Sequence, residues 1–153
     1  MVLLCHLGWV CVLLWDADAR WVAIVGANNS GSSCTYRLEI VQQPWDGSVD
    51  TLDSVYRPIL SPEIIVQVFA YDHDGNEIDN CSACMAQISL CTDDGENVLD
   101  IVTVNGQKTT RALLGDVIKA SQFTSVGTSE GCYFVFDDLS VAAEGTFTFR
   151  ISL

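Results

Sequence analysis

Three polar residues stand at alternate positions in one short stretch, namely Asp72, Asp74 and Asn76. A calcium-binding loop of the EF-hand type begins with this spacing, because carboxylate and amide oxygens are good calcium ligands. Such a loop also needs Gly at its sixth position and Glu at its twelfth. Here those positions hold Glu77 and Ala83. The pattern therefore does not predict a calcium site, and it favours a solvated hairpin turn between two strands.

Seven cysteines are the next residues whose chemistry could define a site. Cys81 and Cys84 form a Cys-x-x-Cys pair, and Cys91 and Cys132 could be imagined as two further zinc ligands. A structural zinc site usually combines two closely spaced ligand pairs, and the second pair is missing here. The pattern favours buried or partly buried free thiols over a metal centre.

Residues for catalysis are sparse. His6 and His73 are the only histidines, and neither has a serine or cysteine neighbour in a recognised nucleophile pattern. There is no Gly-x-Gly-x-x-Gly motif and no phosphate-binding loop with its lysine. We therefore predict no enzyme, no catalytic residue, no metal and no cofactor.

The composition describes the scaffold that must carry any function. The chain has 153 residues, of which 49% are hydrophobic and 18% charged, as in a globular domain with a real core. Its 20 acidic and 7 basic residues give a net charge of -13. DNA is bound through clustered Lys and Arg, so this charge is a handicap for binding DNA. It favours solubility or a basic protein partner.

The N-terminal segment, residues 1–33, differs from the rest. Residues 2–15 are nearly all apolar and are followed by Asp16-Ala17-Asp18-Ala19, as in a secretory signal, but no basic residue precedes the apolar run. The run is also too short to span a membrane. A cleaved signal, an extra element of the domain and non-native sequence all remain open. We place the domain at residues 34–153, after the flexible break at residues 28–33.

Short apolar or alternating runs separated by turn signals predict an all-β sandwich. Residues 46–63 are expected to form a surface loop, and Asn105-Gly106 a tight hairpin turn. In the C-terminal stretch we expect Tyr133, Phe134 and Phe136 to fill the core, and Asp138 and Ser140 to cap a corner. The predicted strands cover residues 36–41, 64–71, 84–90, 98–104, 108–114, 132–136 and 146–153.

Three segments together resemble the velvet family of fungal regulators. The first, residues 36–44, ends in Gln-Gln-Pro; the second contains Arg57-Pro58-Ile59, then Pro62 and residues 65–68; the third covers residues 131–153 and is the most specific. The resemblance implies an immunoglobulin-like sandwich similar to the DNA-binding half of Rel-homology transcription factors. It also implies nuclear homodimers or heterodimers with other velvet proteins, which control sporulation, light-responsive development and secondary metabolism.

The family's DNA contact is attributed to a basic segment, and there this chain departs from the pattern. Where the family has Lys-Asp-Arg-Arg, this chain has Ser54-Val55-Tyr56-Arg57, with Asp50 and Asp53 just upstream. The family also continues beyond the position of Leu153, so the domain is expected to lack its last strand. The candidate DNA-contacting residues are Arg57, Arg37, Lys108, Arg111 and Lys119.

Two function classes therefore stay open. One is a nuclear velvet regulator that binds DNA, with or without a more basic partner, and the other is a dimerisation module that has lost direct DNA contact. We expect no membrane association, and a nuclear location before a cytoplasmic one. A secreted sandwich protein is a third reading, which rests on the N-terminal segment alone.

Overall fold

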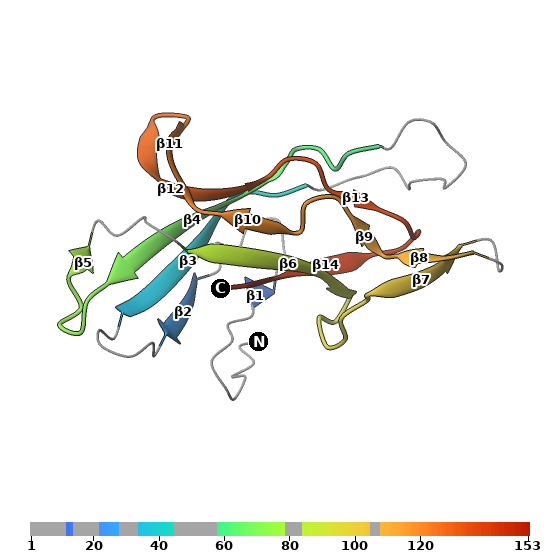
Figure 1. The fold of residues 1–153 in the computed structure, drawn as a ribbon, viewed down its shortest axis with the longest axis horizontal. Coiled ribbons are helices and arrows are strands. Elements are labelled where there is room, and N and C mark those ends of the chain that lie inside the picture. The colour runs from blue at the N-terminus through green and yellow to red at the C-terminus, as the bar shows by residue number, and fades with distance from the viewer. Residues whose placement is uncertain (1–11, 14–21, 28–33, 45–57, 79–83, 105–107) are drawn as a thin grey trace.

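The computed structural model describes residues 12–13, 22–27, 34–44, 58–78, 84–104 and 108–153 (Figure 1). All regular secondary structure in these ranges is β-strand, and within them no helix is long and apolar enough to cross a membrane. The strands are β1 (Val12–Leu13), β2 (Val22–Ala27), β3 (Cys34–Gln42), β4 (Ile64–Tyr71), β5 (Glu77–Ile78), β6 (Met85–Thr92), β7 (Ile101–Val104), β8 (Lys108–Arg111), β9 (Leu113–Leu114), β10 (Ile118–Ala120), β11 (Gln122–Val126), β12 (Ser129–Phe136), β13 (Ser140–Val141) and β14 (Phe147–Ser152).

Two main sheets, both antiparallel, make up the domain. The four-stranded sheet has the order β1-β14-β6-β10, and the six-stranded sheet has the order β11-β12-β4-β3-β2, with β5 paired to β4. In Figure 1 the long strands β6 and β14 run nearly horizontally, at an angle to the diagonal strands β3 and β4. Two further pairs, β13 with β9 and β7 with β8, extend from the main sheets.

The core lies between the two main sheets because each of them has an apolar face. The six-stranded sheet contributes Leu38, Val66 and Phe134, and the four-stranded sheet contributes Ile88 and Ile151, to one cluster of buried side chains. Successive residues of a strand point to opposite faces, so the long strands β3, β4, β6, β12 and β14 supply every second residue to this core. The predicted all-β sandwich is confirmed.

The alternation predicted for the C-terminal strand is also confirmed. In β14, Ile151 is buried, and Phe147 and Phe149 pack against the same core. Thr148 lies on the opposite face of β14 and is nevertheless buried. Its hydroxyl donates a hydrogen bond to the Thr92 carbonyl oxygen at 2.8 Å, so the buried polar group has a partner.

Tyr133 differs from the expectation that it fills the core beside Phe134 and Phe136. All three are buried, but Phe134 and Phe136 belong to the core cluster and Tyr133 does not. As the neighbour of Phe134 in an extended strand, Tyr133 points to the other face. Its hydroxyl donates to the Ser129 carbonyl oxygen at 3.2 Å. A Cβ at Gly131 would stand 3.5 Å from the ring of Tyr133, so the ring lies alongside a glycine.

Several strand boundaries differ from the sequence-based expectation. The single strand predicted over residues 108–114 changes partner at Ala112. The Ala112 N–H still continues the β7–β8 register and donates to the Asp100 carbonyl oxygen at 3.0 Å, whereas its carbonyl oxygen accepts from the Ala142 N–H at 2.9 Å, in register with the pairing of β9 and β13. Strands β10 and β11 lie where no strand was predicted. Strands β1 and β2 add residues from before position 34 to the two sheets. The predicted turn at 105–106 and most of the predicted loop, residues 46–57, lie outside the described residues.

Asp138 fixes the corner that follows β12. Its carboxylate accepts hydrogen bonds from the Asp116 N–H, at 3.0 Å to Oδ1 and 3.2 Å to Oδ2. The chain approaches Asp138 closely at Gly115, where φ is +110°. The capping role expected for Ser140 is wrong, because its hydroxyl is buried and has no hydrogen-bond partner among the described residues.

Candidate nucleic-acid interface

The Asp72 turn is held together by its own hydrogen bonds. Asp72 Oδ1 accepts from the N–H of Asp74 at 2.9 Å and of Asn76 at 2.8 Å. The Asn76 side-chain amide donates to Asp72 Oδ2 at 3.2 Å. These bonds, first the one from the Asn76 N–H, lower the pKa of Asp72. The predicted turn is confirmed, and its carboxylate serves the turn itself.

The cysteines partly differ from the expectation of free thiols. Cys84 and Cys91 are thiols outside any disulfide, whereas Cys132 is disulfide-bonded. In the described part of the chain, no group of three or more His, Cys, Asp or Glu side chains is placed to hold a metal ion.

Four cationic side chains are described, those of Arg37, Arg111, Lys119 and Arg150. Of the other predicted DNA-contacting residues, Arg57 lies outside the described residues, and Lys108 is described only as part of the backbone of β8. A phosphate-binding surface requires cations that are exposed, close together and free to exchange their present partners for phosphate oxygens. The surroundings of each described cation can be judged against that requirement.

Arg37 is compensated within its own sheet. Its Nη1 lies 2.6 Å from Glu39 Oε1, two residues further along β3 and therefore on the same face. The guanidinium also lies over the ring of Phe69, 4.4 Å from the ring centroid, in a cation–π contact. A phosphate at this position would compete with a carboxylate that is already in place.

Lys119 joins the two main sheets. It lies on β10 of the four-stranded sheet, and its Nζ is 3.0 Å from Asp137 Oδ1, just beyond β12 of the six-stranded sheet. A second carboxylate, that of Asp116, lies 3.6 Å away. The hydrogen bond with Asp137 raises the pKa of Lys119 and lowers that of Asp137. Lys119 therefore acts as an ionic clamp between the sheets.

Replacing Lys119 with methionine should remove this clamp and alter the acid stability. Because the folded pKa of Asp137 is depressed below 3.8, the clamp stabilises the fold above about pH 4 and loses its effect as the pH falls through the folded pKa. We expect Lys119→Met to lower the free energy of unfolding by at most about 1 kcal/mol near neutral pH, since Asp137 is largely exposed.

Urea unfolding followed between pH 2 and pH 8 measures this effect. The difference in unfolding free energy between the wild type and Lys119→Met should shrink in the acid range. Lys119→Arg keeps a cation at this position and should retain most of the wild-type stability. A difference that is the same at pH 2 and pH 7 would mean that methionine acts only through packing.

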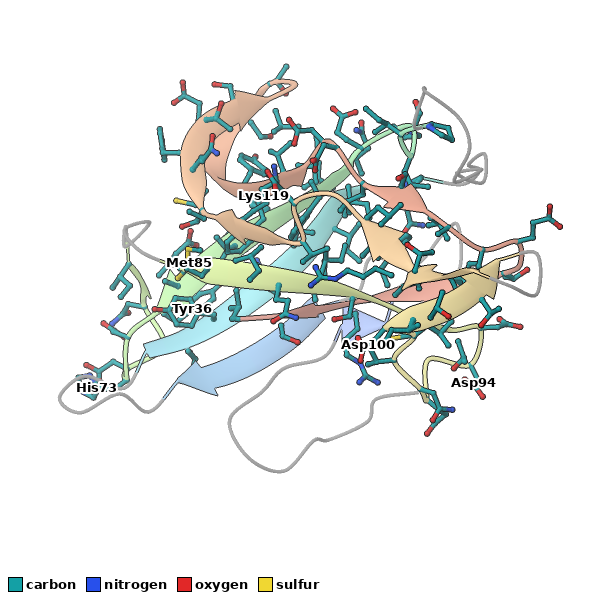
Figure 2. The ribbon with its side chains drawn as sticks, turned by 45° about the vertical axis from the view of Figure 1, so that its right-hand side comes forward. Tyr36, His73, Met85, Asp94, Asp100 and Lys119 are labelled. Atoms are coloured by element: carbon teal, nitrogen blue, oxygen red, sulfur yellow. The ribbon has the colours of Figure 1, made fainter. Side chains whose placement is uncertain are left out.

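Arg111 and Arg150 complete the set of described cations. Arg150 Nη2 donates to the Gly95 carbonyl oxygen at 2.8 Å and so supports a turn. Arg111 is exposed at the end of β8, opposite Ile101, and it is the one described cation without an ion pair or hydrogen bond. Its strand pair is bordered by Asp100 and the acidic turn that contains Asp94, both labelled in the lower right part of Figure 2.

The structure thus distributes the three candidate DNA-contacting side chains that it describes over three sheets. Arg37 lies in the six-stranded sheet, Lys119 in the four-stranded sheet, and Arg111 in the β7–β8 pair. Figure 2 shows Lys119 far from Asp100, which precedes Ile101, the residue that pairs with Arg111. The structure does not bring these cations together, and DNA contact by any of them stays a prediction.

Sequence reasoning missed a different surface. Met85, Ile118 and Phe123 are large apolar side chains that are more than half exposed. They lie on β6, β10 and β11, at one border of the sandwich. The signal was in the sequence, because no charged residue occurs between positions 120 and 129 of a highly acidic chain.

Fold and composition together define an acidic β-sandwich. A family model described as velvet factor matches residues 101–153. A protein of Mycosarcoma maydis named as a sexual development regulator is 33% identical over 135 residues, which cover 82% of this chain and 33% of that protein. The chain belongs to the velvet family. It spans about a third of the length of the relative that it matches.

Proposed function

We propose that this chain is a regulator of fungal development that acts in the nucleus as a dimer, in which a more basic velvet partner provides most of the DNA contact. The developmental role is supported by family membership and by the relative named as a sexual development regulator. Control of sporulation and secondary metabolism is part of this proposal, by analogy with the family.

One observation supports the assignment of most DNA contact to the partner. Of the four described cationic side chains, Arg37 and Lys119 are paired with carboxylates and Arg150 with a carbonyl group. The chain as a whole has a net charge of -13. Each phosphate contact contributes through the release of a counterion, so a chain with so few available cations gains little affinity for DNA at physiological salt.

A mobility-shift titration tests the proposal. The full chain alone is expected not to retard duplex DNA at about 0.15 M salt. Mixed with a velvet protein that retains the Lys-Asp-Arg-Arg segment, it should enter a DNA complex larger than the one formed by the partner alone. Retardation by the full chain alone, at concentrations similar to those needed by the partner, would show that it binds DNA directly.

A further inference from the structure

Strands β10 and β11 form one continuous border of the sandwich. β10 is the outer strand of the four-stranded sheet, and β11 is an outer strand of the six-stranded sheet. Only Ser121 separates them, and its N–H donates to the Cys84 carbonyl oxygen at 2.9 Å. The chain therefore passes from one sheet to the other along the same side of the molecule, and the β11–β12 hairpin curls outward there in Figure 1.

Strand β11 of this border lacks the features that usually protect an outer strand. Such strands are commonly blocked by charged side chains, proline or a bulge, because their unpaired N–H and C=O groups can pair with another chain. Residues 120–129 contain no charged residue and no proline. In β11 the first four residues are exposed, and the Phe123 side chain is 64% exposed. Ile118 on β10 and Met85 at the start of β6 are further apolar side chains that are more than half exposed.

The register shows which backbone groups of β11 face outward. Val126 pairs with Ser129 across the two-residue turn Gly127-Thr128, so these two residues form the hydrogen-bonded pair that closes the hairpin. Hydrogen-bonded and non-hydrogen-bonded pairs alternate along an antiparallel ladder. Thr124 is therefore bonded to β12, whereas Phe123 and Ser125 direct their N–H and C=O groups away from it.

The charge of the molecule indicates what can pair there. A second copy of this chain brings another charge of -13, which opposes its approach. A positively charged protein is attracted, and the neutral β11 can pair with one of its strands without burying an unpaired charge. We propose that β11 adds an extended strand from a positively charged partner protein, with Phe123 as the anchoring side chain. This inference rests on the proposed function and identifies where the basic partner joins.

Two variants of β11 test the inference, with the basic velvet protein of the mobility-shift experiment as the probe. Ser125→Pro removes an outward N–H without breaking the bonds to β12, and Phe123→Lys places a charge on the strand. Ile101→Lys is the matched control, because Ile101 on β7 is also 64% exposed. We expect each β11 variant to increase the dissociation constant for the partner at least tenfold, and the control to leave it unchanged. Thermal melting of each variant verifies that it is folded.

The outcomes separate the inference from the proposed function. If the wild-type chain binds the partner and both β11 variants bind equally well, the inference is wrong while the proposed function stands. If the wild type does not bind the partner at all, both fail. If sedimentation shows that β11 variants lose self-association instead, the occupant of this border is a second copy of the chain, and the inference is overturned.

Discussion

Replacing Phe134 with alanine is expected to lower the free energy of unfolding by about 3–5 kcal/mol. Phe134 is fully buried in the core cluster, and its strand β12 lies between β11 and β4. Removing the ring takes apolar surface out of the core and leaves a cavity that neighbouring strands cannot fill without disturbing their pairing. A domain is stable by only about 5–15 kcal/mol, so the loss is a large part of the total. Urea unfolding measures it.

The control for this prediction is Phe123→Ala. This phenylalanine lies on the neighbouring strand β11 and is 64% exposed, so its truncation should change the free energy of unfolding by about 0.5 kcal/mol or less. Equal losses at the two positions would contradict the assignment of Phe134 to the core and of Phe123 to a binding surface.

Replacing Gly115 with alanine is expected to lower the free energy of unfolding by about 2–5 kcal/mol, since two unfavourable effects combine. Its φ of +110° is a conformation that residues with a side chain rarely adopt. A Cβ would also clash with the carbonyl oxygen of Asp138, where backbone must move to make room. The corner that joins β9 and β10 to the end of β12 would open, and the Asp116–Asp138 hydrogen bonds would weaken.

Gly75→Ala separates these two effects. Gly75 also has a positive φ, +82°, but a Cβ there meets nothing within 4 Å. The Gly75→Ala variant should therefore lose only the conformational contribution to the free energy of unfolding, about 1–2 kcal/mol. A Gly115→Ala variant no less stable than Gly75→Ala would show that the backbone at Asp138 shifts to accommodate the Cβ with little loss of stability.

The strands that bury apolar residues could be predicted from the sequence, and the others could not. The run from Ile64 to Tyr71 became β4 with the predicted bounds, and the alternation after Thr146 became β14. β11 has no such signal, because Gln122, Thr124 and Ser125 are exposed polar residues. It forms by pairing with β12 across a tight turn, and hence depends on a neighbour that local pattern does not reveal.

The sheet face on which Tyr133 lies and the ion pairs of the cations show a second limit of prediction from sequence. An apolar run such as Cys132 to Phe136 hides which residues face the core, although alternation forbids adjacent residues from sharing a face. The Arg37–Glu39 pair could have been predicted from its i, i+2 spacing in a strand. The Lys119–Asp137 pair could not, because it requires β10 to lie beside the end of β12.

The salt dependence of DNA binding by the mixed complex tests most directly whether the basic partner makes most of the phosphate contacts. The logarithm of the binding constant falls with the logarithm of the salt concentration, with a slope of about -0.9 per phosphate contact. We compare the complex containing the wild-type chain with one in which this chain carries Arg57→Ala and Arg111→Ala together. We predict the same slope for both complexes, because the partner makes the phosphate contacts. A slope that becomes shallower by about two in the double variant would show that this chain itself grips the DNA backbone.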